Sequence, residues 1–159
     1  MAGVTITVDD AQVLERLQQL LDTVTDPRPA LRDAGEALLR STRHRFDTQT
    51  APDGHPWAPL SPATVARKKK NKDKILVLDG YLRGTLNYQV VGGTTLELGS
   101  PMIYAGTQQF GAHKGQYGST RRGSPIPWGD IPARPFLGLS AGDKREVLAI
   151  LQEHLRKGH

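Results

Sequence analysis

The sequence has no cysteine among its 159 residues. A disulfide framework, a thiolate nucleophile and a cysteine-based zinc site are therefore all excluded. No apolar run approaches the roughly 20 residues needed to cross a bilayer. The amino terminus has neither a basic segment nor a continuous apolar core, so we expect no signal peptide. We expect a soluble protein that is made in the cytoplasm and has no membrane partner.

Motifs of the common enzyme classes are also missing. The five histidines do not form HExxH or another metal-binding spacing, and there is no GxSxG, Walker loop or GxGxxG motif. Asp53 and Asp130 each stand alone in a turn-rich stretch, where turn formation explains them. We therefore expect no enzyme, no metal and no cofactor. A hydrolase or nuclease site that only the fold assembles stays open as a minor alternative.

The length and composition of the chain predict a single domain over residues 1–159. Hydrophobic residues make up 37% of the chain, which favours a modest core with long exposed loops or with surface that a partner covers. The formal net charge is +5, which is compatible with a nearby polyanion but says nothing about the fold.

A basic run between residues 67 and 74 is the strongest charge cluster. It contains six basic side chains and one acid, Asp73. One interpretation is an exposed loop, because like charges repel and resist packing. The other is a phosphate-facing patch that binds without reading sequence and weakens with salt. No aromatic residue interleaves the run, so stacking on single-stranded bases is not indicated.

The periodicity predicts an α+β fold with a small, mainly antiparallel sheet and helices packed on one of its faces. Strand alternation appears at residues 4–8 and at 86–98, where Gly92-Gly93 marks a hairpin turn. Residues 131–140 are read as an extended strand. Helices are expected at residues 11–24, 29–47, 62–66, 80–84, 102–111 and 141–156.

Residues 112–130 show no periodicity at all. This glycine-rich segment carries Lys114, Arg121 and Arg122 and has no acid before Asp130. A structureless loop this long in a small domain is usually functional or disordered. A segment that becomes ordered only against a partner would meet both descriptions.

The stretch 131–140 organises the rest of the chain. Two prolines flank Arg134 and keep the backbone extended. Phe136 is an apolar anchor, and Ser140 with Asp143 forms a short-armed capping box for the last helix. Arg134 either pins one surface to another, in this chain or in a neighbour, or lies solvated on an edge strand.

Four segments in order resemble the virion morphogenesis family of tailed bacteriophages, the tail completion proteins. They are residues 46–61 with the PDGHPWAPLS sequence, residues 75–82, residues 104–111 and residues 131–140. The resemblance implies a structural role at the end of the tail tube or at the neck, where the tail joins the DNA-filled head.

The resemblance also implies partners and a location. Related proteins form rings, commonly of six subunits, so the expected partners are further copies of the chain, the tail tube protein and head-tail connector or adaptor proteins. The expected location is the virion, after assembly in the cytoplasm of the bacterial host. Genomic DNA would pass through the lumen without sequence readout.

Two sets of residues are candidates for these contacts. The predicted subunit or partner interface consists of Trp57, Tyr104, Phe110, Trp128, Arg134 and Phe136. The side chains predicted to face a DNA channel are Arg67, Lys68, Lys69, Lys70, Lys72, Lys74, Lys114, Arg121 and Arg122. The alternative function is a sequence-nonspecific DNA-binding module that uses the same basic loops.

Overall fold

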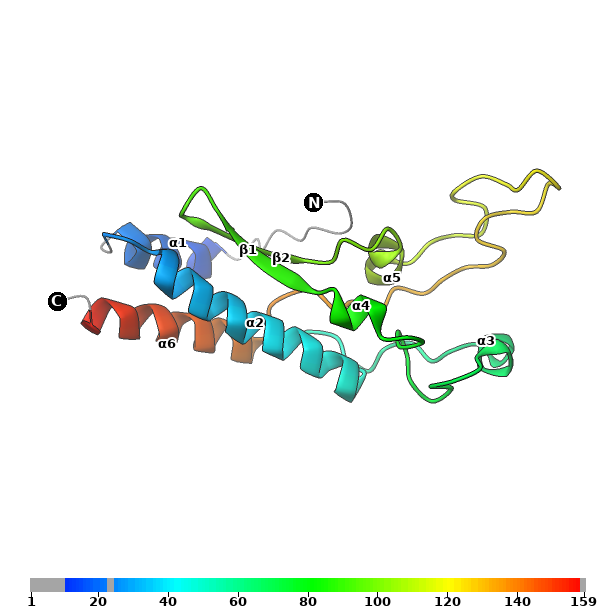
Figure 1. Cartoon of the computed structure of the whole chain (residues 1–159), viewed down its shortest axis with the longest axis horizontal. Coiled ribbons are helices and arrows are strands. Elements are labelled where there is room, and N and C mark those ends of the chain that lie inside the picture. The colour runs from blue at the N-terminus through cyan, green and yellow to red at the C-terminus, as the bar shows by residue number, and fades with distance from the viewer. Residues whose placement is uncertain (1–10, 23–24, 158–159) are drawn as a thin grey trace.

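The described part of the chain, residues 11–22 and 25–157 of a computed structural model, contains helices, a two-stranded sheet and long irregular segments (Figure 1). The expected strand over residues 4–8 lies outside these residues. In chain order the elements are α1 (Ala11–Asp22), α2 (Arg28–Thr48), α3 (Pro62–Arg67), α4 (Tyr81–Gly84), β1 (Asn87–Val91), β2 (Thr95–Gly99), α5 (Ala105–Phe110) and α6 (Ala141–Lys157).

Two long helices, α2 and α6, form the base of the molecule. They run antiparallel and side by side, with the hairpin packed against α2 and with α1 against α6 (Figure 1). A proline in the first turn of α2 suits a position whose backbone N–H has no partner within the helix. Buried side chains recur along α2 at helical spacing, as the predicted helix over residues 29–47 requires. They include Leu31, Ala34, Leu39, Thr42 and Phe46, whereas Leu38 is half-buried.

The hairpin confirms the predicted alternation of side chains. Tyr88 lies opposite Leu98 and Val90 lies opposite Leu96 on the half-buried face. On the exposed face the amide of Gln89 donates a hydrogen bond of 2.7 Å to the carboxylate of Glu97. Helices and this small antiparallel sheet together give the α+β fold that the periodicity predicts.

Three aromatic rings form the centre of the core. Phe46 of α2 packs edge-on against Trp57 at 5.3 Å between ring centroids, and against Phe136 at 5.6 Å. Leu39, Leu82, Leu86, Ala105 and Leu137 complete the buried cluster. These residues come from segments far apart in the sequence, so the core holds α2, α4, α5 and the loops between them together.

The prediction of a strand over residues 131–140 is wrong in one respect. The stretch is extended, but its only ladder contact among the described residues is an isolated bridge between Ile131 and Ala112. Pro132 and Pro135 have no N–H to donate, so a continuous ladder cannot form here. Side chains from other segments satisfy the backbone instead.

Candidate interaction surface

The side chains of Trp57 and Gln109 hold the extended stretch 131–140 to the body of the protein. The indole N–H of Trp57 donates to the carbonyl of Pro135 at 2.7 Å. Gln109 accepts the N–H groups of Phe136 and Leu137 at 3.0 Å each and donates to the carbonyl of Leu137 at 3.1 Å. A single buried amide thus replaces a strand partner, and the sequence alone gave no indication of this role for Gln109.

Arg134 links the extended stretch to the loop that follows Trp57. Its Nε donates to the carbonyl of Ala58 at 2.7 Å, and its Nη2 donates to the carbonyl of Pro59 at 2.9 Å. The residue is 6% exposed, and this burial lowers the pKa of its guanidinium. Of the two interpretations that the sequence leaves open, the structure therefore supports a pin, within one chain.

The start of α6 is held by a buried network around Asp143. The Ser140 N–H donates to the Asp143 carboxylate at 2.8 Å, and the Asp143 N–H donates to Ser140 Oγ at 3.0 Å. This reciprocal pair confirms the predicted capping box. The same carboxylate forms an ion pair with Arg45 of α2, which also donates to the carbonyls of Phe136 and Gly138.

The burial of Arg45 is not expected from its residue type. A charged residue on a helix usually lies on the solvated side, but Arg45 is buried. Its position three residues after Thr42 continues the stripe of Leu31, Ala34 and Leu38, and this spacing was the signal that could have found it. Burial lowers the pKa of Arg45, and the charge and hydrogen bond of Asp143 oppose that shift.

The basic run folds into a loop held from within by Lys68. Its Nζ donates to the carbonyls of Asn71, Lys74 and Val77 at 2.6, 2.7 and 2.9 Å. Partial burial among these groups lowers the pKa of the Lys68 ammonium. Lys68 is therefore a structural residue of the loop, and its charge is directed at the protein's own backbone.

Lys70 is also paired within the chain, with Asp79. Asp79 does not cap α4, because Gly80 occupies the N-cap position and no side chain caps that helix. The remaining cations of the predicted channel-facing set are exposed and have no ion-pair or hydrogen-bond partner for their side chains within residues 11–22 and 25–157. They are Arg67, Lys69, Lys72, Lys74, Lys114, Arg121 and Arg122.

Residues 112–130 form an arm that projects from the body beyond α5 (Figure 1). The two sides of the arm are joined by backbone hydrogen bonds, including Tyr117 N–H to Ile126 carbonyl and Ile126 N–H to Gly118 carbonyl, both 2.8 Å. The arm is therefore a closed, irregular hairpin, although no periodicity in the sequence indicated one.

The base of the arm depends on Gly111. Its φ is +76°, and a Cβ at this position would lie 2.6 Å from the carbonyl oxygen of Ile131. Only glycine permits this approach of two backbones without a shift of one of them. The predicted end of α5 at Gly111 is thus confirmed. Glycine is required here both for the turn that ends the helix and for the close contact with the backbone of Ile131.

Exposed large apolar side chains gather on the arm and around its base. Trp128 on the arm is 67% exposed and Ile103 beside α5 is 90% exposed. Phe110 and Tyr117 line the same shallow depression as Ile103. We call Ile103, Phe110, Tyr117, Ile126 and Trp128 the arm patch. An apolar surface of this kind on a folded chain typically marks a contact with another protein.

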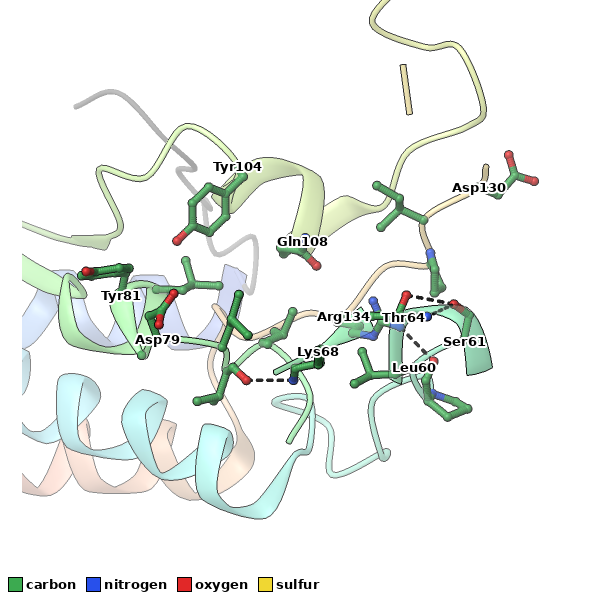
Figure 2. Close-up of a pocket in the computed structure, with 18 of the residues that line it drawn as sticks. Leu60, Ser61, Thr64, Lys68, Asp79, Tyr81, Tyr104, Gln108, Asp130 and Arg134 are labelled. Carbon is green, nitrogen blue, oxygen red and sulfur yellow. Dashed lines mark hydrogen bonds between the residues drawn. The ribbon is translucent and has the colours of Figure 1, made fainter. Parts of the chain in front are cut away.

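A groove of about 900 Å³ lies on the other side of α5 (Figure 2). Its walls come from the loop before α3, the segment that leads into α4, and the start of the extended stretch 131–140. Leu78, Tyr81 and Tyr104 expose apolar surface in it. Lys68 and Arg134 also line it, with their charges directed at backbone carbonyls.

The predicted interface residues divide into two groups. Trp57, Arg134 and Phe136 are buried in the protomer and serve its own fold. Tyr104, Phe110 and Trp128 are exposed, the first in the groove and the other two in the arm patch. Only the second group is free to contact another molecule.

No group of three or more side chains suited to a metal ion occurs within residues 11–22 and 25–157. Among the helices of the same residues, none is long and apolar enough to span a bilayer.

Comparison with known proteins gives the family of the chain. Residues 8–156 match the model of the phage virion morphogenesis family. A protein of Escherichia phage Mu, described as putative capsid assembly protein G, is 32% identical over 89% of this chain and 90% of its own length. Tail completion protein S of Escherichia phage P2 is 27% identical over 90% of this chain and 95% of its own length. No solved structure matches the chain. The match over nearly the whole length, which includes the pinned stretch, the groove and the arm, shows that this chain belongs to the phage virion morphogenesis family.

Proposed function

We propose that this chain is a structural, non-enzymatic protein that completes the phage tail. The relative from phage P2 is a tail completion protein, and its similarity extends over 90% of this chain. The observation that carries the proposal is the arm patch, where large apolar side chains are displayed on an ordered hairpin instead of being buried. Such a surface suits a protein that works by contact with others.

The chain acts as a ring, with six copies as the expected number. A ring requires head-to-tail contacts between two different surfaces of each copy. Residues 67–74 and 112–130 together carry nine basic and two acidic residues, a net charge of +7, so the remainder of the chain carries −2. The arm patch supplies one of the two surfaces that a ring needs, and its exposed apolar side chains pack against the body of the next copy.

The ring lies at the end of the tail or at the neck and contacts the tail tube protein and the head-tail connector or adaptor. Exposed cations such as Lys69, Lys72 and Arg121 face the lumen, where they contact passing DNA through phosphates alone. The alternative of a free-standing DNA-binding module is not supported by the family or by the relatives.

The test combines oligomeric state with tail joining. Light scattering after gel filtration is expected to show a closed oligomer, or a monomer that assembles when purified tails lacking this protein are added. Trp128→Ser and Phe110→Ser should abolish assembly while the circular dichroism spectrum stays unchanged. Val91→Ser is the matched control, because Val91 is an exposed apolar residue of β1 outside the arm patch. A wild-type chain that stays monomeric and does not join tails would contradict the proposal.

A further inference from the structure

The groove beside α5 and the arm patch are two separate apolar surfaces of one chain. The groove has a volume of about 900 Å³, at the upper end of the range typical of ligand clefts. Tyr81, which is 63% exposed, lines it together with Leu78 and Tyr104. The arm projects away from the body, and its Trp128 does not line the groove of its own chain (Figure 1). Trp128 is therefore placed to contact another molecule.

Polar groups on these two surfaces have complementary, unused hydrogen-bonding capacity. The indole N–H of Trp128 has no acceptor within the described residues, and an indole needs one when it becomes buried. In the groove, the side-chain amide of Gln108 has no partner in the described chain (Figure 2). Oδ1 of Asp130 accepts the Lys114 N–H at 2.7 Å and lies 3.9 Å from Nδ1 of His113, whereas its Oδ2 has no partner within the described residues. The groove thus offers acceptors to an indole that enters it.

The charged side chains that line the groove leave one exposed charge. Lys68 and Arg134 donate to backbone carbonyls, and Asp79 is paired with Lys70. The side chain of Asp130 is 76% exposed, and no lysine or arginine pairs with it within the described residues. The lining therefore presents one carboxylate, which repels DNA phosphates and acidic protein segments and favours a basic occupant.

The arm of a second copy matches both the apolar walls and this charge. Residues 112–129 contain three basic side chains and no acid. Arg122, at the tip, is exposed and has no partner within the described residues, and it stays available when Arg121 faces the lumen. A ring requires contact between two different surfaces of each copy, and the arm and the groove form such a pair.

We propose that the groove of one copy receives the arm of the next copy. The inference rests on the proposed function, because it names the surface of the body that the arm patch contacts in the ring. Trp128 is the anchor of this contact. Its ring packs on Leu78 and Tyr104 of the neighbour, and its indole N–H donates to the side-chain carbonyl of Gln108. The carboxylate of Asp130 in the same groove lies against the basic arm.

Cysteine cross-linking tests this contact without background, because the chain has no cysteine of its own. Gly129→Cys lies on the arm beside Trp128, where an added Cβ meets nothing within 4 Å. Leu78→Cys lies on the wall of the groove. The two single variants, one with an affinity tag, are mixed, assembled alone or on purified tails, and treated with a short bismaleimide. We expect a covalent heterodimer on denaturing gels, and a chain with both substitutions should give a ladder of covalent oligomers.

Matched variants separate this contact from others. Val91→Cys replaces Leu78→Cys in the control, since Val91 is exposed on β1 outside both surfaces, and it should give no heterodimer. Tyr81→Ser should weaken self-association about tenfold, the scale of a truncated aromatic side chain at an interface. Asp130→Asn, which keeps an acceptor for the Lys114 N–H, should weaken it about threefold, the scale of an exposed charge contact.

Three results would overturn the inference. Equal cross-linking of Gly129→Cys with Val91→Cys would show that the contact is not selective, and cross-linking of Gly129→Cys only with itself would show arms that meet each other. An oligomer without any cross-link between positions 129 and 78 would place the arm on another surface, and the proposed function would stand. A wild-type chain that neither self-associates nor joins tails would contradict the proposed function as well.

Discussion

Replacement of Arg45 by methionine tests whether the buried network between α2 and α6 stabilises the fold. Arg45 and Asp143 are 6% and 5% exposed in their side chains, and they form an ion pair. Arg45 also donates to the carbonyls of Phe136 and Gly138 at 2.9 and 3.0 Å. Arg45→Met keeps much of the side-chain volume but removes every one of these donors.

The expected loss of stability follows from the polar groups that stay buried after Arg45 is replaced. The Asp143 carboxylate loses its cation, and breaking a buried pair from one side costs about 3–5 kcal/mol. The two carbonyls lose their donors, which is part of the same cost, since an unsatisfied buried group costs about 1–3 kcal/mol. The Ser41 hydroxyl and the Ser140 N–H still donate to Asp143 and limit the damage. We expect a free energy of unfolding about 3–4 kcal/mol lower than that of the wild type.

Urea denaturation followed by circular dichroism measures this loss at neutral pH. Arg40→Met is the matched control, since Arg40 pairs with Glu146 between the same two helices but the side chains are 70% and 47% exposed. We expect the control to lose less than about 1 kcal/mol. The double variant Arg45→Met/Asp143→Asn keeps an acceptor for the Ser140 N–H and leaves no unpaired charge, so it should lose no more than Arg45→Met does. If Arg45→Met does not fold, the milder Arg45→Lys, which keeps a charge beside Asp143, gives the measurable loss. A loss in Arg45→Met equal to that in Arg40→Met would refute the reasoning.

Two further predictions concern local packing. Gly35→Ala places a Cβ 2.4 Å from the ring of Tyr88, so we expect a loss of about 1–3 kcal/mol in urea denaturation despite the better helix propensity of alanine. Gly106→Ala is the control, because Gly106 also lies in a helix but has nothing within 4 Å of the added Cβ. It should be neutral or stabilising by up to about 1 kcal/mol. An equal loss of stability in Gly35→Ala and Gly106→Ala would contradict the clash with Tyr88. Lys68→Ala removes three hydrogen bonds that close the basic loop, so trypsin cleavage within residues 67–74 should accelerate about tenfold, as measured by mass spectrometry. Lys69→Ala is the control, because it also removes one trypsin site but removes no hydrogen bond of the loop. Equal acceleration of cleavage in Lys68→Ala and Lys69→Ala would exclude the structural role of Lys68.

Local patterns in the sequence predicted the elements that depend on neighbouring residues. The period of α2, the alternation of the hairpin and the Ser140–Asp143 capping box each depend on side chains a few positions apart. Their energetics are local, so spacing alone is enough to find them. The resemblance to the family likewise depended on short segments in a fixed order, and the comparison over residues 8–156 bears it out.

Side-chain roles that depend on distant segments could not be read in this way. Trp57 and Phe136 were expected at an interface, but the fold brings both against Phe46 and buries them. An aromatic residue in a loop has the same sequence context whether it faces a partner or the core. The choice is made by contacts between residues that lie tens of positions apart.

The sequence by itself determined the helical and hairpin periods, the family and the surplus of positive charge in two loops. Only the tertiary structure decided which charges are available. Lys68 and Lys70 lie within the same basic run as Lys69 and Lys72, yet the first two are held by carbonyls and by Asp79. The physical reason is that the donors and acceptors around a charged side chain decide whether its charge is available to another molecule. Folding brings those groups together from segments on both sides of the residue in the sequence.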